Sequence, residues 1–177
     1  MKKLGILLSA TVGMVAAIGT KAVNAKQMTR QEYNDFRGWQ LPENENGADE
    51  GYLVEYQDGE PNTTEYKGYV SWSPKAQFDN AYQDVTKGVS FGHAVELLKA
   101  GHRVAREGWN GKGMFLYYVP ENKYPASRNE QATMIGMFKD DMVPYREYIA
   151  LKTVDNQVVP WAPSISDALA EDWQIVE

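Results

Sequence analysis

Three features of the sequence predict an α+β protein built from two small modules, each an antiparallel sheet with short helices. Short runs rich in aromatic and β-branched residues alternate with turn-forming segments, which is typical of antiparallel strands. The helix signals are few and short, and each begins at a capping residue. A weak spacer at 85–88 divides the 177 residues into segments 18–84 and 89–177, each of the size of a small domain.

The first module opens with a strand and a short helix. We expect the strand within Ile18–Lys26. Thr29 and Glu32 have the spacing of a capping box, in which hydroxyl and carboxylate satisfy backbone N–H groups that the first helical turn leaves free. A helix over Arg30–Arg37 follows, and Gly38 ends it in a left-handed conformation.

A hairpin and a second helix complete this module. We expect a polar loop at 42–50 and a strand at Gly51–Tyr56. A turn at 58–62 then leads to a second strand at Gly68–Trp72. Ser73 and Pro74 predict the start of a helix that runs to about Tyr82, because a capping residue followed by proline is typical of helix N-termini.

The second module opens with an amphipathic helix and continues with strands. Ser90 caps the helix and Gly101 ends it. Its apolar stripe, at the spacing of one helix face, is Phe91, Ala94, Val95 and Leu98. The expected strands are His102–Arg106, Met114–Val119, Tyr145–Thr153, Val158–Trp161 and Trp173–Val176, with a hairpin turn at 154–157.

Two irregular segments interrupt these strands. Residues 120–143 mix charges with Pro125 and an apolar patch at 134–138, which predicts a mobile loop. Ser164 and Asp167 have the spacing of a capped helix start, so we expect a last short helix that ends at Ala170.

Composition excludes several classes of site. The formal charge of −6 gives no general basic surface, so we expect no nucleic acid polymer as a partner. The chain has no cysteine, which excludes disulfides, thiolate nucleophiles and cysteine-ligated metals. His93 and His102 lie at opposite ends of the expected helix and do not form a metal pair. We expect no metal and no cofactor.

Conventional catalytic motifs are also missing from the sequence. It contains neither a Gly-x-Ser-x-Gly elbow nor a His-Glu-x-x-His motif. The side chains of the adjacent pairs Asp140-Asp141 and Glu171-Asp172 project in different directions. We therefore expect these carboxylates to be solvated at the ends of elements and not to bind a metal ion together. These observations favour a protein that is not an enzyme.

The segment from Val89 to the C-terminus resembles a known family. The resemblance rests on the helix signal Ser90–Gly101, the aromatic and glycine-rich Arg106–Phe115, and the closing Val159-Pro160-Trp161 and Leu169–Val176. This segment closely resembles the phage anti-Thoeris signal-sponge family, the second of the named Thoeris anti-defence families. The resemblance implies a counter-defence protein that binds a cyclic ADP-ribose-type messenger without cleaving it and so blocks effector activation. It also implies a homotetramer with pockets where protomers meet.

The resemblance gives weight to the aromatic residues around the glycine-rich turn. Trp109 and Phe115 flank Asn110–Gly113, where glycines let the backbone approach a ligand and the rings offer stacking faces for adenine. The alternative is an ordinary hairpin with both rings in the core. Lys112 is either solvated or pairs with phosphate. We expect Trp109, Asn110, Lys112 and Phe115 to bind the ligand.

Two further groups are candidates for ligand contacts. Arg146, expected in a strand with Tyr145 and Tyr148, either binds phosphate oxygens or pairs with Glu147 or Asp155. Beyond the turn, an aromatic ring is followed by hydroxyls and amides at a helix start, a combination that suits an anion or a ribose. These residues are Trp161, Ser164, Ser166 and Asp167. Capping by Ser164 is compatible with binding.

Residues 1–17 do not decide between a protein of the host cytoplasm and an exported one. Lys2-Lys3, the apolar run Leu4–Ile18 and Val23-Asn24-Ala25 have the form of a secretory signal. The run is shorter than the roughly 20 residues of a membrane span, so we expect no stable span. However, the stretch from Ile18 resembles the opening of a module at the front of small phage proteins. Cleavage after Ala25 would then remove its first strand.

Sequestration of a small cyclic nucleotide by a homotetramer in the host cytoplasm is the leading functional hypothesis. One alternative is an enzyme that cleaves the same messenger. The other is an exported or virion-associated structural protein, which the apolar N-terminus favours. The role of segment 18–84 stays open.

Overall fold

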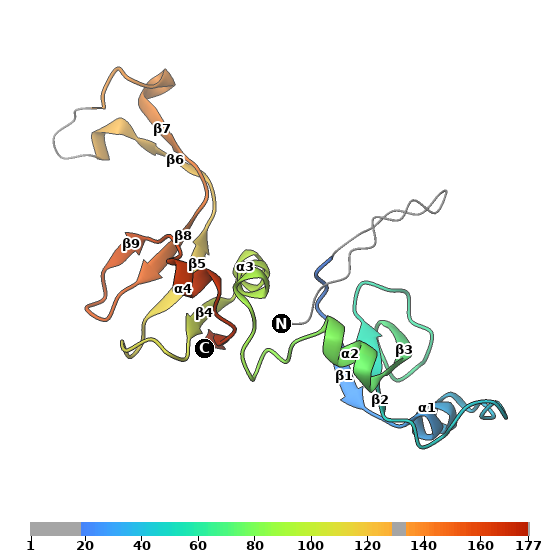
Figure 1. Ribbon diagram of the computed structural model, residues 1–177. Coiled ribbons are helices and arrows are strands. Elements are labelled where there is room, and N and C mark those ends of the chain that lie inside the picture. Colours follow the sequence, from blue (N-terminus) through green and yellow to red (C-terminus); the bar gives the residue numbers. More distant parts are fainter. Residues whose placement is uncertain (1–18, 129–133, 177) are drawn as a thin grey trace, which may run out of the picture. The chain divides into compact units, whose positions relative to one another are not determined.

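The computed structural model describes residues 19–128 and 134–176, which form two compact units within Met1–Tyr82 and Gln83–Glu177 (Figure 1). Each unit is built on an antiparallel sheet with short helices, which confirms the predicted α+β class. The expected extension 1–17 lies outside the described residues. Among the residues that are described, no helix is long and apolar enough to cross a membrane.

The N-terminal unit contains a three-stranded sheet in the order β1-β2-β3. Its strands are β1 (Asn24–Gln27), β2 (Gly51–Tyr56) and β3 (Tyr69–Pro74), and its helices are α1 (Arg30–Arg37) and α2 (Lys75–Ala81). The capping box of Thr29 and Glu32 is present, and Gly38 ends α1 with φ +66°. These local predictions are confirmed.

Both faces of this sheet are packed with aromatic side chains. Leu53 and Val70 are buried with Tyr33 of α1 on one face. On the other face, Tyr52 stacks on Phe78 of α2 with 4.2 Å between ring centroids. The sheet therefore uses α1 and α2 to cover opposite faces.

The predicted start of α2 at Ser73 is wrong. Ser73 and Pro74 pair with Tyr52 and Gly51 and belong to β3, and the helix begins at Lys75. The Ser73 side chain makes no cap hydrogen bond to the helix. Pairing with β2 therefore keeps Ser73 and Pro74 in the strand, and the helix start that their sequence favours does not form there.

The C-terminal unit contains a five-stranded sheet in the order β10-β4-β5-β8-β9. The strands are β4 (Arg103–Arg106), β5 (Phe115–Val119), β8 (Tyr148–Lys152), β9 (Val158–Pro160) and β10 (Trp173–Val176). Ser90 caps α3 (Phe91–Lys99), and Gly101 follows with φ +93°. The helix packs on β4, β5 and β10.

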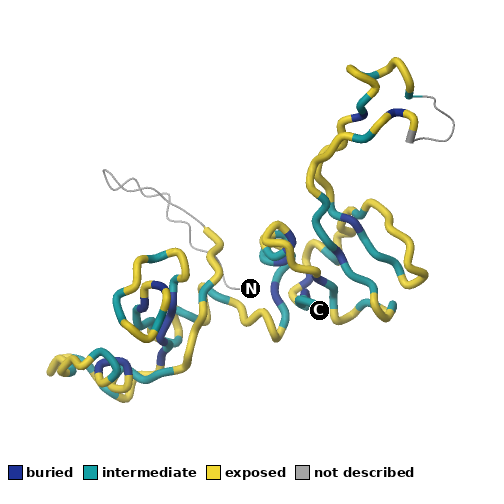
Figure 2. The backbone as a smooth tube through the Cα atoms, turned by 180° about the vertical axis from the view of Figure 1, so that it is seen from behind, coloured by how far each residue is buried: buried dark blue, intermediate teal, exposed yellow. Residues whose placement is uncertain are grey.

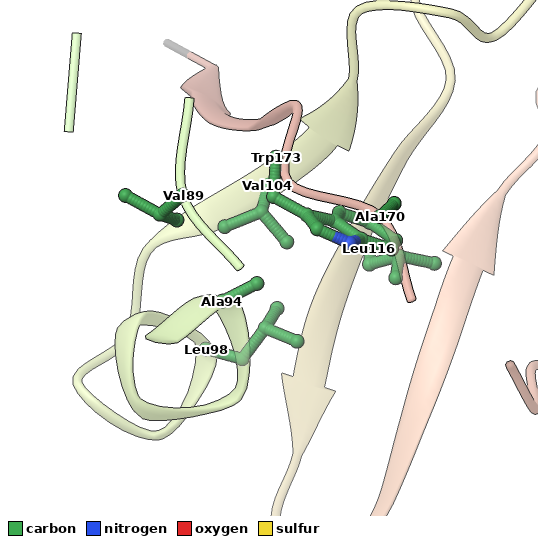
Figure 3. Close-up of a cluster of buried hydrophobic side chains, with 7 residues drawn as sticks. All are labelled: Val89, Ala94, Leu98, Val104, Leu116, Ala170 and Trp173. Atoms are coloured by element: carbon green, nitrogen blue, oxygen red, sulfur yellow. The ribbon is translucent and has the colours of Figure 1, made fainter. Parts of the chain in front are cut away.

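The core of this unit lies between α3 and one face of the sheet (Figures 2 and 3). Ala94 and Leu98 of α3 face Val104 of β4 and Leu116 of β5, which are paired in register. Trp173 at the start of β10 is completely buried beside them. The register places every second residue of β4, β5 and β8 on this core face and the others on the opposite face.

Residues 120–143 were expected to form a mobile loop, and for the described part this expectation is wrong. β6 (Asn122–Pro125) pairs with β7 (Met142–Tyr145), and the two extend from β5 and β8 away from the main sheet (Figure 1). Short 3-10 turns follow β6 and precede β7, at Ala126–Arg128 and Lys139–Asp141. The sequence of β6 is polar and does not indicate a strand, so the strand is recognised only from its pairing with β7. Residues 129–133 of this segment lie outside the described residues.

Candidate functional site

Three partly buried aromatic rings surround the buried Trp173 beside the core of the C-terminal unit. The ring of Trp109 lies 5.5 Å from that of Trp173 at an angle of 76°, and the ring of Trp161 lies 5.9 Å from it at 81°. Phe91 of α3 packs on the same indole at 5.5 Å. Each outer ring is therefore held in place by the core while part of it faces solvent.

A short helix brings polar groups to these rings. Ser164 caps α4 (Ile165–Ala168) in a capping box with Asp167, as predicted. The Ser166 hydroxyl lies 2.9 Å from that of Ser164, and both serines are exposed. The indole N–H of Trp109 donates to Asp167 Oδ1 at 3.4 Å. We call Trp109, Trp161, Ser164, Ser166 and Asp167 the Trp109 site.

Arg106 ties this site to the rest of the sheet. Its Nη1 donates to Asp167 Oδ1 at 2.9 Å, and its Nε donates to Asp172 Oδ1 at 2.8 Å. Asp172 in turn accepts the backbone N–H of Gly108, one residue before Trp109, at 3.2 Å. One guanidinium therefore links β4, α4, the start of β10 and the turn that carries Trp109.

The side chains of this network stabilise one another in their ionised forms. Hydrogen bonds from Arg106 lower the pKa of Asp172. Burial raises the pKa of Asp167, but hydrogen bonds from Ser164 and Arg106 outweigh burial, so the pKa is lowered. Hydrogen bonds to both carboxylates, first to Asp172, raise the pKa of Arg106. At neutral pH one cation thus meets two carboxylates, and the network carries excess negative charge.

The glycine-rich turn is shaped by its two glycines. Gly113 has φ +74°, a conformation that side chains rarely adopt. A Cβ on Gly111 would lie 2.0 Å from the sulfur of Met114 and 2.6 Å from Cγ2 of Val154, so a side chain here would require both neighbours to move. Asn110 and Lys112 lie in this turn, and both are exposed.

Phe115 is not part of the Trp109 site. It lies at the start of β5 on the sheet face opposite the core, because its neighbour Leu116 points inward. There the guanidinium of Arg103 lies 5.2 Å from the ring centroid. The sequence had placed both rings around one turn, and the tertiary fold separates them.

The expectation that Arg146 sits in a strand is wrong. It falls between β7 and β8 and is exposed. Within the described ranges it forms no ion pair with Glu147 or Asp155. The pairing alternative for Arg146 is therefore not supported.

Sequence reasoning missed Arg106 and misread Asp172. Asp172 was expected to be a solvated end, whereas it pairs with Arg106 and is partly buried. One signal was available: Arg106 shares the strand face of Val104, and a cation on a core face needs a partner. Over residues 19–128 and 134–176, no group of three or more His, Cys, Asp or Glu side chains could hold a metal ion.

Comparison with known proteins identifies the family of the C-terminal unit. The model of the Thoeris anti-defense 2-like domain matches residues 89–176. Thoeris anti-defense 2 of Bacillus phage SP01 is 42% identical over 88 residues, which cover 50% of this chain and 94% of the phage protein. This similarity supports a phage anti-Thoeris function. The chain belongs to the Thoeris anti-defense 2-like family.

Proposed function

We propose that this protein binds and sequesters a cyclic ADP-ribose-type messenger of Thoeris defence at the Trp109 site, without cleaving it. Effector activation then fails because free messenger is depleted. The observation that carries the proposal is the convergence of two partly exposed indoles, two exposed serines and a carboxylate beside the core of the C-terminal unit. This chemistry matches the base and ribose of a nucleotide.

Stacking and ribose contacts account for part of the affinity. An aromatic ring under a base contributes about 1–3 kcal/mol. Nanomolar capture requires roughly 12 kcal/mol, so phosphate contacts must add to it. Lys112 and Arg146 are exposed cations that suit this role, the Asn110 amide is a further donor, and Phe115 is a candidate for ring contacts with the ligand. Lys112 lies in the turn that carries Trp109, whereas Arg146 lies between β7 and β8, so the proposed pocket draws on several segments.

A homotetramer would bring such surfaces together. Ile165 of α4 and Leu169, which follows the helix, are 81% and 77% exposed, and neighbouring exposed apolar side chains suit a protein–protein contact. They are separated by one helical turn and lie next to Ser164 and Ser166. Burial of these side chains between protomers would close the site from solvent.

The same geometry favours binding over cleavage. A general base needs a free lone pair and a pKa near the operating pH. Asp167 accepts hydrogen bonds from Arg106, Trp109 and Ser164, and its pKa is lowered and not raised. Asp172 is held in the same way by Arg106. Neither carboxylate is suited to abstract a proton from water.

Calorimetry with a panel of cyclic ADP-ribose isomers and cyclic dinucleotides tests the proposal. We expect tight binding of at least one cyclic ADP-ribose isomer and recovery of the intact ligand after heat denaturation of the complex. Recovery of a linear product would identify the protein as an enzyme. The absence of binding across the panel would refute sequestration.

A further inference from the structure

The three guanidinium nitrogens of Arg106 are all engaged by carboxylates. Nε and Nη2 donate to the two oxygens of Asp172 at 2.8 and 3.4 Å, and Nη1 donates to Asp167 at 2.9 Å. The Arg106 side chain is only 20% exposed. Three of its five N–H groups therefore donate to carboxylates, and a phosphate approaching the two remaining N–H groups would meet the negative charge of Asp167 and Asp172.

The two carboxylates hold the two parts of the site that surround Trp109. Asp172 accepts the backbone N–H of Gly108 and so fixes the turn before Trp109. Asp167 accepts the indole N–H of Trp109 and also closes the capping box with Ser164. Arg106 contacts both carboxylates from a single point on β4, so it is placed to orient them together.

We infer that Arg106 is the positioning residue of the Trp109 site, and that the ligand presents hydroxyl or amino donors to this end of the site while its phosphates lie elsewhere. This inference rests on the proposed function. The planar fork of arginine bridges two carboxylates, whereas the ammonium of lysine acts as a single point charge. We therefore expect Arg106→Lys to pair with only one of the two carboxylates.

The test uses the full chain with Arg106→Gln and Arg106→Lys, and Arg30→Gln as a matched control. Arg30 also forms an ion pair, with Glu45, and lies over the Trp72 ring, but in the N-terminal unit. The first readout is the indole N–H resonance of Trp109, assigned by its loss in Trp109→Phe. The second is the affinity for the cyclic ADP-ribose isomer that the wild type binds, measured at low and high salt.

We expect Arg106→Gln to shift the Trp109 indole resonance while those of Trp39 and Trp72 stay in place. Affinity should fall at least tenfold with the salt dependence of the wild type, and Arg106→Lys should restore part of it. Arg30→Gln should change neither readout. If Arg106→Gln does not fold, Asp172→Ala replaces it, because it removes the acceptor of the Gly108 N–H and leaves the Arg106–Asp167 pair intact.

An unchanged indole resonance or an unchanged affinity would overturn the inference. A salt dependence that becomes flatter in Arg106→Gln would also overturn it, because that result identifies a direct phosphate ligand. If the wild type binds no isomer, the proposed function fails. The indole resonance then still decides whether Arg106 positions Trp109.

Discussion

Replacement of Trp109 by alanine separates a binding role from a packing role. The indole contacts both Trp173 and Trp161, at 5.5 and 6.3 Å between ring centroids, and donates to Asp167. Loss of a fully buried tryptophan typically costs about 3–5 kcal/mol of stability. Because Trp109 is only partly buried, we expect a cost at or below the lower end of that range, about 2–3 kcal/mol.

The effect on binding is expected to be separate from this cost. Loss of one stacking face removes about 1–3 kcal/mol, which corresponds to roughly a 5- to 150-fold weaker affinity. Trp109→Phe should bind more tightly than Trp109→Ala, because it keeps a ring and loses only the N–H donor. Trp39→Ala is the control, since this exposed indole lies in the N-terminal unit.

Urea denaturation establishes that each variant is folded, and calorimetry then gives the affinity. A folded Trp109→Ala protein with wild-type affinity would refute the stacking argument and assign the residue to packing alone. A parallel loss of affinity in Trp39→Ala would also contradict it, because the effect would then not be specific to the site.

Three further predictions concern charge, pH and the N-terminus. Arg146→Gln should weaken binding of the messenger and flatten its salt dependence in calorimetry, whereas wild-type values would leave Lys112 as the phosphate candidate. The pKa values of Asp167 and Asp172 are lowered in the folded protein, so their stabilisation is present above the unfolded pKa of about 3.9 and is lost as pH falls through the folded values. Urea titrations between pH 7 and pH 3 should therefore show a steeper acid loss in wild type than in Asp172→Asn, and equal slopes would contradict this linkage. Mass spectrometry of the expressed chain should find no cleavage after Ala25, since that cut falls inside β1, and a mature N-terminus at residue 26 would favour export.

The local features of this fold follow from the sequence. Ser90 and the Ser164–Asp167 pair were identified as helix starts, and the structure confirms them. Capping depends on residues three positions apart, so the information needed is contained in one short segment. The family resemblance from Val89 onward is confirmed by the match over 89–176.

The composition of the candidate site depends on long-range contacts. Phe115 and Trp109 are close in sequence, yet the pairing of Val104 with Leu116 turns Phe115 to the opposite face. Arg106 and Asp172 are 66 positions apart and meet because β10 pairs with β4. A strand places its side chains on two faces, and only the register with its neighbours decides which face meets the core. The sequence by itself therefore determined the starts of α1, α3 and α4, the strands of the two main sheets and the family, whereas the tertiary structure decided the start of α2, the β6–β7 pair and which side chains share a site.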